Sequence, residues 1–192
     1  MKLCMIGTGY VGLVTGTCFA DIGNQVYCVD KDESKINKLN SGISPIYEPG
    51  LDELIKKNFK AKRLLFTTDL KKAINLSDII FICVGTPNIK GSLKVDLSFI
   101  YKCTKQILMN ANKKKIIVTK STVPVGTGDE IEKIIKRKRK LFSVISNPEF
   151  LREGEAIRDF RYPDRIIIGS NNNIEFKVMK KLYAPLINKG AN

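Results

Sequence analysis

Three glycines that follow a short apolar run constrain the fold of this 192-residue chain more than any other feature. The apolar run at 3–6 leads directly into the pattern Gly7-x-Gly9-x-x-Gly12. Apolar residues at helical spacing follow over 10–22, and a second apolar run covers 25–29, which predicts a strand–helix–strand unit. In such a unit the first glycine forms the tight turn and the second lets a pyrophosphate approach the backbone. The third lets the helix pack closely on the sheet.

The residue that ends the second strand, Asp30, indicates what such a unit would bind. A pyrophosphate at the helix N-terminus is favoured by free N–H groups and by the helix dipole. The Asp30 carboxylate would accept hydrogen bonds from a ribose diol and would repel a 2′-phosphate. These residues favour NAD over NADP, although Lys31 and Lys35 reduce the repulsion. An ordinary glycine-rich turn without a ligand is the alternative interpretation.

The composition excludes several classes of protein. The chain has no histidine and five cysteines without a CxxC pair, which argues against a histidine base, a Cys/His metal site and a disulfide framework. We therefore expect no metal. No apolar run approaches the ~20 residues that span a bilayer. The apolar stretch after Lys2 resembles a signal peptide, but the glycine pattern occupies the same residues. We therefore expect a cytoplasmic protein without a membrane partner.

The net charge of +14 allows three interpretations. A basic surface can bind nucleic acid, steer anionic small molecules toward a site, or simply reflect a lysine-rich composition. The densest basic run, at 136–140, lies at the end of a predicted helix, where cations complement the helix dipole and stay solvated. The compositional interpretation is favoured, and no nucleic-acid partner is expected.

Strands and helices alternate along almost the whole chain. After the first unit, strands are predicted at 64–67, 79–84, 116–119, 141–145 and 165–168. Helices are predicted from about 32, at 51–60, from an Asp69 cap to 75, from an Asp96 cap to 110, from a Thr127/Glu130 capping box to 139, and at 174–187. This order predicts an α/β fold of the Rossmann type: a doubly wound parallel sheet with helices on both faces. Residues 1–170 would form the domain, and 171–192 a linker and the start of a helix.

Parallel strands in such a sheet end at one edge, where ligands bind. Reading the ends of the predicted strands in order gives the segments 7–9, 30, 85–87, 121–124 and 147–150. They contain glycines, hydroxyls, prolines and carboxylates. This edge is the predicted site.

Four further segments carry a family resemblance. They are VGTP at 84–87, STVPVGT at 121–127, SNPEFLREGEAIRDFRYPDRIIIG at 146–169 and YEPGLDEL at 47–54. Together they resemble the UDP-glucose/GDP-mannose dehydrogenase family, over essentially the whole chain. The resemblance implies an NAD-binding domain of an enzyme that oxidises a sugar C6 alcohol to a carboxylate in two steps, with two NAD and a cysteine nucleophile. The ending PDRIIIG favours UDP-glucose as the sugar; GDP-mannose, a UDP-N-acetylhexosamine, or a non-catalytic NAD-binding remnant are the alternatives.

The resemblance also implies roles for individual residues. Thr122 and Glu149 match the pair that positions and activates the hydrolytic water. Val11 would lie against the pyrophosphate turn, Asp30 and Lys35 at the adenosine ribose, and Thr86 and Ser121 along the path to the nicotinamide. The full set of implied cofactor contacts is Gly7, Gly9, Tyr10, Val11, Gly12, Asp30, Lys35, Thr86, Ser121 and Glu153. The implied contacts of the nucleotide sugar are Glu149, Phe150, Leu151, Arg152 and Glu153.

Taken one by one, these residues also have plainer interpretations. Thr86 and Ser121 could be loop hydroxyls that bond to the backbone, and Glu149 a solvated carboxylate. Tyr47 and Glu48 could simply shape a loop, and no role is assigned to them. The arginines of the last segment could bind phosphate or pair with nearby carboxylates; these are Arg152, Arg158 and Arg165, beside Glu155, Asp159 and Asp164.

Members of the family are longer than this chain. By resemblance, the missing part would hold the cysteine nucleophile, a substrate-side lysine and asparagine, and the helical segment through which the intact enzyme forms a homodimer. Cys83 is predicted inside a buried strand, where a thiol without a cationic neighbour has a raised pKa. We expect this chain alone to bind NAD without oxidising a UDP-sugar. The final helix, with Ile174, Val178, Leu182, Leu186 and Ile187, would pack partly against the missing part.

Overall fold

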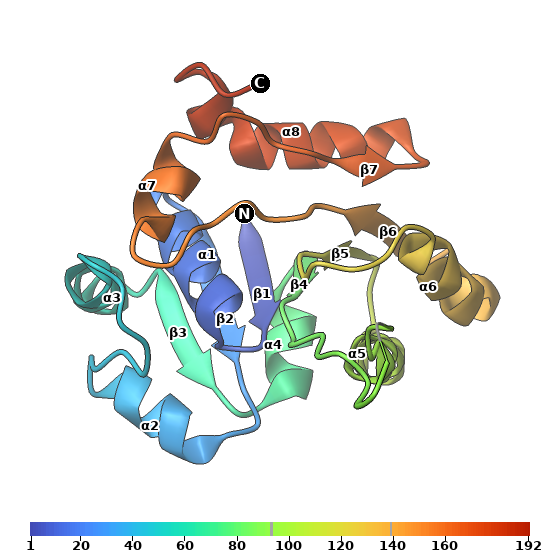
Figure 1. The fold of residues 1–192 in the computed structure, drawn as a ribbon, viewed down its shortest axis with the longest axis horizontal. Helices are drawn as coiled ribbons and strands as arrows, with labels where there is room; N and C mark the ends of the chain where they lie inside the picture. The colour runs from blue at the N-terminus through green and yellow to red at the C-terminus, as the bar shows by residue number, and fades with distance from the viewer. Residues whose placement is uncertain (93, 139) are drawn as a thin grey trace.

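The computed structural model describes residues 1–92, 94–138 and 140–192. Within these residues the centre of the molecule is a seven-stranded sheet in the order β3-β2-β1-β4-β5-β6-β7 (Figure 1). Strands β1 to β6 are parallel, and β7 is antiparallel to β6. This confirms the predicted doubly wound sheet. The strands are β1 (Lys2–Ile6), β2 (Gln25–Val29), β3 (Leu64–Thr67), β4 (Ile79–Ile82), β5 (Lys115–Thr119), β6 (Phe142–Ser146) and β7 (Gly169–Ser170).

Helices cover both faces of the sheet. They are α1 (Tyr10–Asp21), α2 (Glu33–Asn40), α3 (Leu51–Lys60), α4 (Leu70–Leu76), α5 (Ser98–Asn110), α6 (Thr127–Ile135), α7 (Ala156–Arg161) and α8 (Asn173–Ile187), with a 3₁₀ turn η1 (Lys136–Lys138). Alternate residues of the strands point to opposite faces. Leu3 and Met5 of β1 join one apolar cluster with α1, α2, α3, α7 and α8, whereas Cys4 and Ile6 join another with α4, α5 and α6. No helix in the described residues is long and apolar enough to cross a membrane.

The strand order reverses between β1 and β4, and this reversal places the candidate site. Chain connections leave β1 toward β2 on one side and reach β4 on the other, so the loops at the carboxyl ends of these two strands part from each other. A crevice at that point is where ligands bind in open α/β sheets. The turn after β1 starts there, and its Gly7 N–H donates to the carbonyl of Val29 at the end of β2 (2.8 Å).

Two predicted strands differ from the observed ones. The segment 165–168 is not a strand; its Ile166 N–H donates to Asn192 O (2.7 Å), and Ile167 O accepts from the Asn147 side chain (2.8 Å). These backbone groups are therefore bonded outside a ladder, and only Gly169–Ser170 pairs with β6. The strand predicted at 79–84 ends at Ile82, because Val84 O accepts the Ser121 hydroxyl instead of a neighbouring strand.

The predicted ends of three helices, α4, α5 and α6, are partly wrong. Asp69 caps α4 as predicted, by accepting from Lys72 N (2.9 Å). The Thr127/Glu130 capping box is wrong, because α6 begins after Gly126 at φ +88° and the Thr127 hydroxyl bonds to Pro124 O (2.7 Å). The α-helix ends at Ile135, short of the predicted 139, and position 139 lies outside the described residues. The cap of α5 is Leu97; Asp96, predicted as the cap, accepts from Ser98 N instead.

Helix α8 packs on the rest of the chain along β6 and β7 (Figure 1). Its Tyr183 ring lies 5.3 Å from the ring of Phe19 in α1, and Phe19 also contacts Phe81 and Phe160. Of the apolar residues expected on the final helix, Leu182 and Leu186 are buried and Ile174 is exposed. Most of the apolar stripe of α8 is thus covered by this chain itself.

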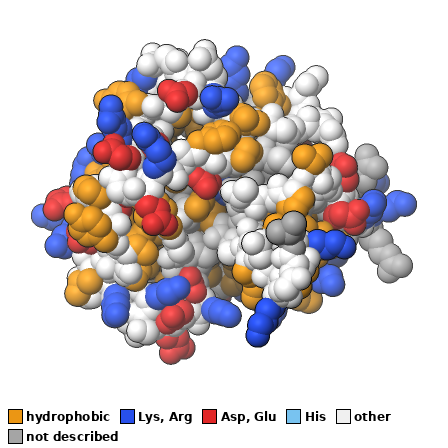
Figure 2. All heavy atoms as spheres, viewed as in Figure 1, with side chains coloured by type: hydrophobic (Ala, Val, Ile, Leu, Met, Phe, Trp, Pro, Cys, Tyr) orange, Lys and Arg blue, Asp and Glu red, His pale blue; other side chains and the backbone are white. Residues whose placement is uncertain are grey.

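Basic side chains do not gather in one patch on the face drawn in Figure 2. Lysine and arginine side chains lie around that face and are interspersed with acidic ones. The mixture is typical of a solvated surface.

Candidate functional site

The glycine turn leaves no room for side chains at two of its three glycines. A Cβ on Gly7, which has φ +104°, would lie 2.7 Å from Cys83 O, and a Cβ on Gly12 would lie 2.0 Å from Gly7 O. A Cβ on Gly9 would meet nothing within 4 Å, so the space above this residue is open. The turn therefore packs tightly against Cys83, the residue after β4, on one side and offers bare backbone at the start of α1 on the other. This arrangement fits a pyrophosphate.

Asp30 lies beside this turn at the end of β2. Its Oδ2 accepts from the backbone N–H and the hydroxyl of Thr8 (2.9 and 2.8 Å), and its Oδ1 accepts from Asp32 N (3.1 Å). Burial alone would raise the pKa of Asp30, but these hydrogen bonds and the nearby charge of Lys35 outweigh it and lower the pKa. The carboxylate is charged and keeps lone pairs for a diol. Thr8, which sequence reasoning missed, orients it.

The loops after β4 and β5 are tied to each other. The Thr86 hydroxyl donates to Thr122 O (3.0 Å), and the buried Ser121 hydroxyl donates to Val84 O (2.6 Å). Both hydroxyls therefore bond to the backbone, as their plainer interpretation held. Thr122 itself is exposed at this edge. These bonds link the two loops that carry two of the predicted cofactor residues and one predicted catalytic residue.

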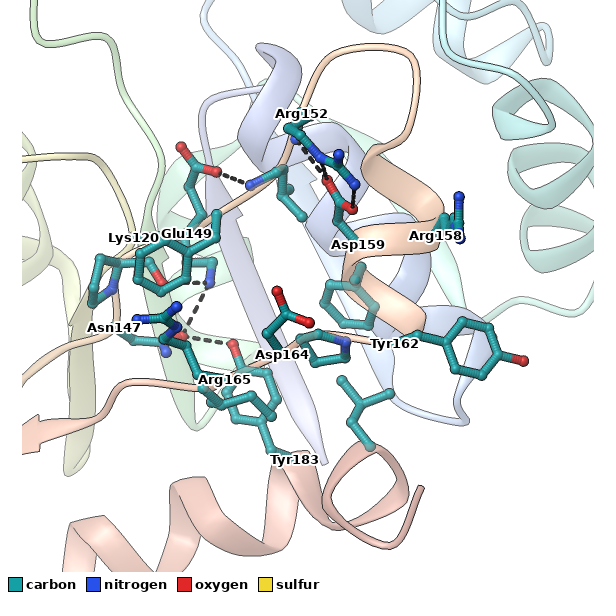
Figure 3. A pocket seen from close by; sticks show the side chains of 17 residues that line it. Lys120, Asn147, Glu149, Arg152, Arg158, Asp159, Tyr162, Asp164, Arg165 and Tyr183 are labelled. Carbon is teal, nitrogen blue, oxygen red and sulfur yellow. Dashed lines mark hydrogen bonds and ion pairs between the residues drawn. The ribbon is translucent and has the colours of Figure 1, made fainter. Parts of the chain in front are cut away.

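The segment after β6 carries the predicted sugar contacts. Glu149 is half-buried, and its Oε2 accepts from Leu151 N (2.6 Å), which fixes the carboxylate against its own turn (Figure 3). Phe150 and Glu153 are exposed. The ring of Phe150 lies 5.9 Å from the guanidinium of Arg165.

The arginines of this segment are paired with acidic or aromatic groups. Arg152 donates to both carboxylate oxygens of Asp159 (2.6 and 3.0 Å; Figure 3). Arg158 lies 3.4 Å from Glu155. Asp159 has a lowered pKa, chiefly because of the Arg152 hydrogen bond.

A cavity of about 740 Å³ lies between this segment, α7 and α8. Lys120 lines it and is buried; its Nζ lies 3.3 Å from Pro148 O and 3.4 Å from Asn147 Oδ1, and the Tyr183 hydroxyl donates to the same Oδ1 (2.6 Å; Figure 3). Burial lowers the pKa of Lys120 to about 8, against the opposing effects of Cys83 and Glu149. The sequence offered only one signal for Lys120: its place at the end of a strand.

All five cysteines are free and buried. Burial raises the pKa of Cys83 to about 12, as predicted, although Lys120 is a cationic neighbour that the sequence did not indicate. In the described residues no three His, Cys, Asp or Glu side chains are close enough together to hold a metal ion.

The carboxyl ends of five neighbouring strands thus bring the predicted residues to one edge. The glycine turn and the first residues of α1, Tyr10 and Val11, follow β1. The others lie after β2, β4, β5 and β6: Asp30, Thr86, Ser121, Thr122 and Glu149. Lys35 lies half-buried in the first turn of α2, near Asp30.

A model of the NAD binding domain of the UDP-glucose/GDP-mannose dehydrogenase family matches residues 1–187. The chain belongs to this family. NAD is therefore the dinucleotide for which the glycine turn and Asp30 are arranged.

Individual members show how far the similarity extends. The UDP-glucose 6-dehydrogenase of Rhizobium meliloti is 53% identical, over 97% of this chain and 44% of that protein. That of Bacillus subtilis is 50% identical, over 96% of this chain and 40% of that protein. The solved GDP-mannose dehydrogenase of Pseudomonas aeruginosa, a ternary complex, superposes with a TM-score of 0.91 at 36% identity, over 97% of this chain and 44% of that chain. The chain spans less than half the length of these relatives.

Proposed function

We propose that this chain is the NAD-binding part of a UDP-glucose 6-dehydrogenase and that, alone, it binds NAD without turnover. The observation that carries the proposal is the bare, tightly packed glycine turn beside the charged Asp30 carboxylate. UDP-glucose is favoured over GDP-mannose or a UDP-N-acetylhexosamine because the relatives that are 53% and 50% identical to the chain are UDP-glucose 6-dehydrogenases.

Oxidation of a C6 alcohol to a carboxylate removes two hydrides and adds one oxygen from water. Bound NAD supplies the hydride acceptor. The chain's own residues would bind and orient: backbone N–H groups at the start of α1 hold the pyrophosphate and Asp30 holds the ribose diol. Lys35 would lie at the same ribose, and Thr86 and Ser121 would line the way to the nicotinamide.

Glu149 and Thr122 would act on the water in the hydrolytic step. The half-buried Glu149 carboxylate can accept a proton from that water, and the exposed Thr122 hydroxyl can orient it. Residues 149–153 would contact the sugar nucleotide. The five buried cysteines are unsuited to the nucleophilic step, because burial raises the pKa of each thiol.

The wider organisation follows from the same assignment. Residues 1–170 would be the cofactor domain, and 171–192 would begin the connection to the part of the longer relatives that this chain does not span. Through that part the intact enzyme would form a homodimer. The five free cysteines support a reducing compartment such as the cytoplasm.

Calorimetric titration with NAD tests the cofactor assignment. Asp30→Ala should weaken NAD binding about tenfold, since a charge-assisted hydrogen bond is lost. Asp78→Ala, which removes an exposed carboxylate before β4 at the opposite edge of the sheet, should not. Wild-type chain should prefer NAD to NADP, and Asp30→Ala should reduce that preference. Folded wild-type chain that does not bind NAD, or equal affinities for wild type and Asp30→Ala, would refute the assignment.

The sugar is tested by titrating the NAD-loaded chain with UDP-glucose and with GDP-mannose. Tighter binding of UDP-glucose is expected. Tighter binding of GDP-mannose would reverse the choice of substrate and leave the cofactor assignment intact.

A further inference from the structure

Glu48 is a buried carboxylate that the proposed function does not use. It lies in the YEPGLDEL segment before α3 and is only 6% exposed. No lysine or arginine in the described residues forms an ion pair with it. A buried carboxylate without a cation is costly unless several donors surround it. The donors that surround Glu48 therefore indicate its role.

Three donors from two other segments converge on this carboxylate. Oε2 accepts from the Tyr10 hydroxyl and from Gly154 N (2.8 Å), and Oε1 accepts from Ile157 N (3.2 Å). Tyr10 is the first residue of α1 and follows Gly9 of the glycine turn. Gly154 and Ile157 belong to the turn after the predicted sugar contacts and to the start of α7.

The Tyr10 hydroxyl closes the same cluster. It accepts from Gly154 N (2.9 Å) and lies 3.4 Å from Arg152 O, so one N–H is shared between the phenol and the carboxylate. Helices α3 and α7 both pack against α1, which brings the three segments together (Figure 1). The cluster thus joins the cofactor turn directly to residues 152–157.

We infer that Glu48 is a positioning residue that fixes segment 150–155 against the first turn of α1, so that NAD binding and the order of that segment are coupled. The inference rests on the proposed function only in placing NAD at the glycine turn. Coupling of this kind is reciprocal: if holding the segment favours NAD, bound NAD must hold the segment. A carboxylate that only stabilised the fold would give no such coupling.

Glutamine is the sharpest substitution at this site. It keeps the size of the side chain but offers one acceptor oxygen and one NH₂ donor. With three donors converging, at least one of them would then face the NH₂ group. Tyr10→Phe removes only the hydroxyl and provides a milder variant. Glu53→Gln, an exposed carboxylate of α3, is the matched control.

Amide hydrogen exchange at Gly154 and Ile157, followed with and without saturating NAD, tests the coupling in the 192-residue chain. In Glu48→Gln both amides should exchange about tenfold faster than in wild type, because their acceptor is weakened. NAD should slow their exchange in wild type and Glu53→Gln, and much less in Glu48→Gln. NAD affinity should fall several-fold in Glu48→Gln and in Tyr10→Phe, and the double variant should bind no more weakly than the weaker single variant.

Equal exchange rates in Glu48→Gln and wild type would overturn the inference. So would an unchanged NAD affinity in both single variants, or effects that simply add in the double variant. If Glu48→Gln does not fold, Tyr10→Phe alone decides through its exchange rates and its NAD affinity. These outcomes differ from those that would refute the proposed function. The proposed function fails only if the wild-type chain does not bind NAD, or if Asp30→Ala leaves its NAD affinity unchanged.

Discussion

Lys120→Met removes a buried ammonium whose hydrogen-bond acceptors are neutral. The nearest acceptors of its Nζ are an amide oxygen and a backbone carbonyl at 3.4 and 3.3 Å, both at long hydrogen-bond distance. The ionisable groups nearby are the Cys83 thiol and the Glu149 carboxylate. Burial dominates and lowers the pKa from 10.5 to about 8. Burying the charged Lys120 ammonium in the folded chain at pH 7 therefore costs about 3 kcal/mol relative to the unfolded chain.

The sign of the pH dependence follows from this lowered pKa. Between pH 8 and 10.5 the unfolded chain holds the lysine proton and the folded chain has lost it, so the free energy of unfolding rises with pH. From pH 7 to pH 9 the wild type should gain about 1.4 kcal/mol relative to Lys120→Met. The cysteines titrate in both proteins, so their effect cancels in the difference.

Urea unfolding followed by far-UV circular dichroism at pH 7, 8 and 9 measures this difference. Lys180→Met, on the exposed side of α8, controls for the loss of one positive charge. Its difference from wild type should stay constant over the same range. A constant difference for Lys120→Met as well would refute the reasoning, because it would mean that burial does not control the protonation of this lysine.

Three further predictions concern packing and charge. Gly12→Ala should destabilise the chain by more than about 2 kcal/mol, as an overpacked core does, because its Cβ would lie 2.0 Å from Gly7 O. Gly9→Ala should fold normally yet weaken NAD binding, because its Cβ meets nothing in the protein. Similar urea midpoints for the two variants would contradict this prediction. Asp21→Asn should lose about 2 kcal/mol at pH 7, since Asp21 accepts from Lys57, Asn58 and Arg161. Burial alone would raise the pKa of Asp21, but its hydrogen bonds outweigh burial and lower the pKa. The loss of stability in Asp21→Asn should therefore shrink as the pH falls through this lowered pKa. A loss of the same size at pH 2 would contradict the prediction. A thiol reagent at pH 8 should label none of the five cysteines in folded chain and all five in urea; rapid native labelling of Cys83 would show that its burial is incomplete.

Much of the fold could be predicted because the signals are local. The period of apolar residues located α1, α3, β2 and β3 at the observed bounds, or within one residue of them. Predictions failed where backbone groups bond elsewhere. At 165–168 they bond to the chain's last residue and to a side chain, and at 127 a hydroxyl bonds back to Pro124. Propensity carries no information on such partners.

The sequence by itself determined the glycine turn, the acidic residue at the end of the second strand and the edge at which the strand ends meet. The close approach of Gly12 to Gly7 O and the period of the strands depend on residues that are near in sequence. Tertiary structure alone decided the environments of Glu48 and Lys120. The donors to Glu48 lie 38, 106 and 109 positions away, and the acceptors of Lys120 lie 27 and 28 positions away. Contacts between separate loops leave no periodic trace in a sequence, because the crossovers of the fold, and not local geometry, bring them together.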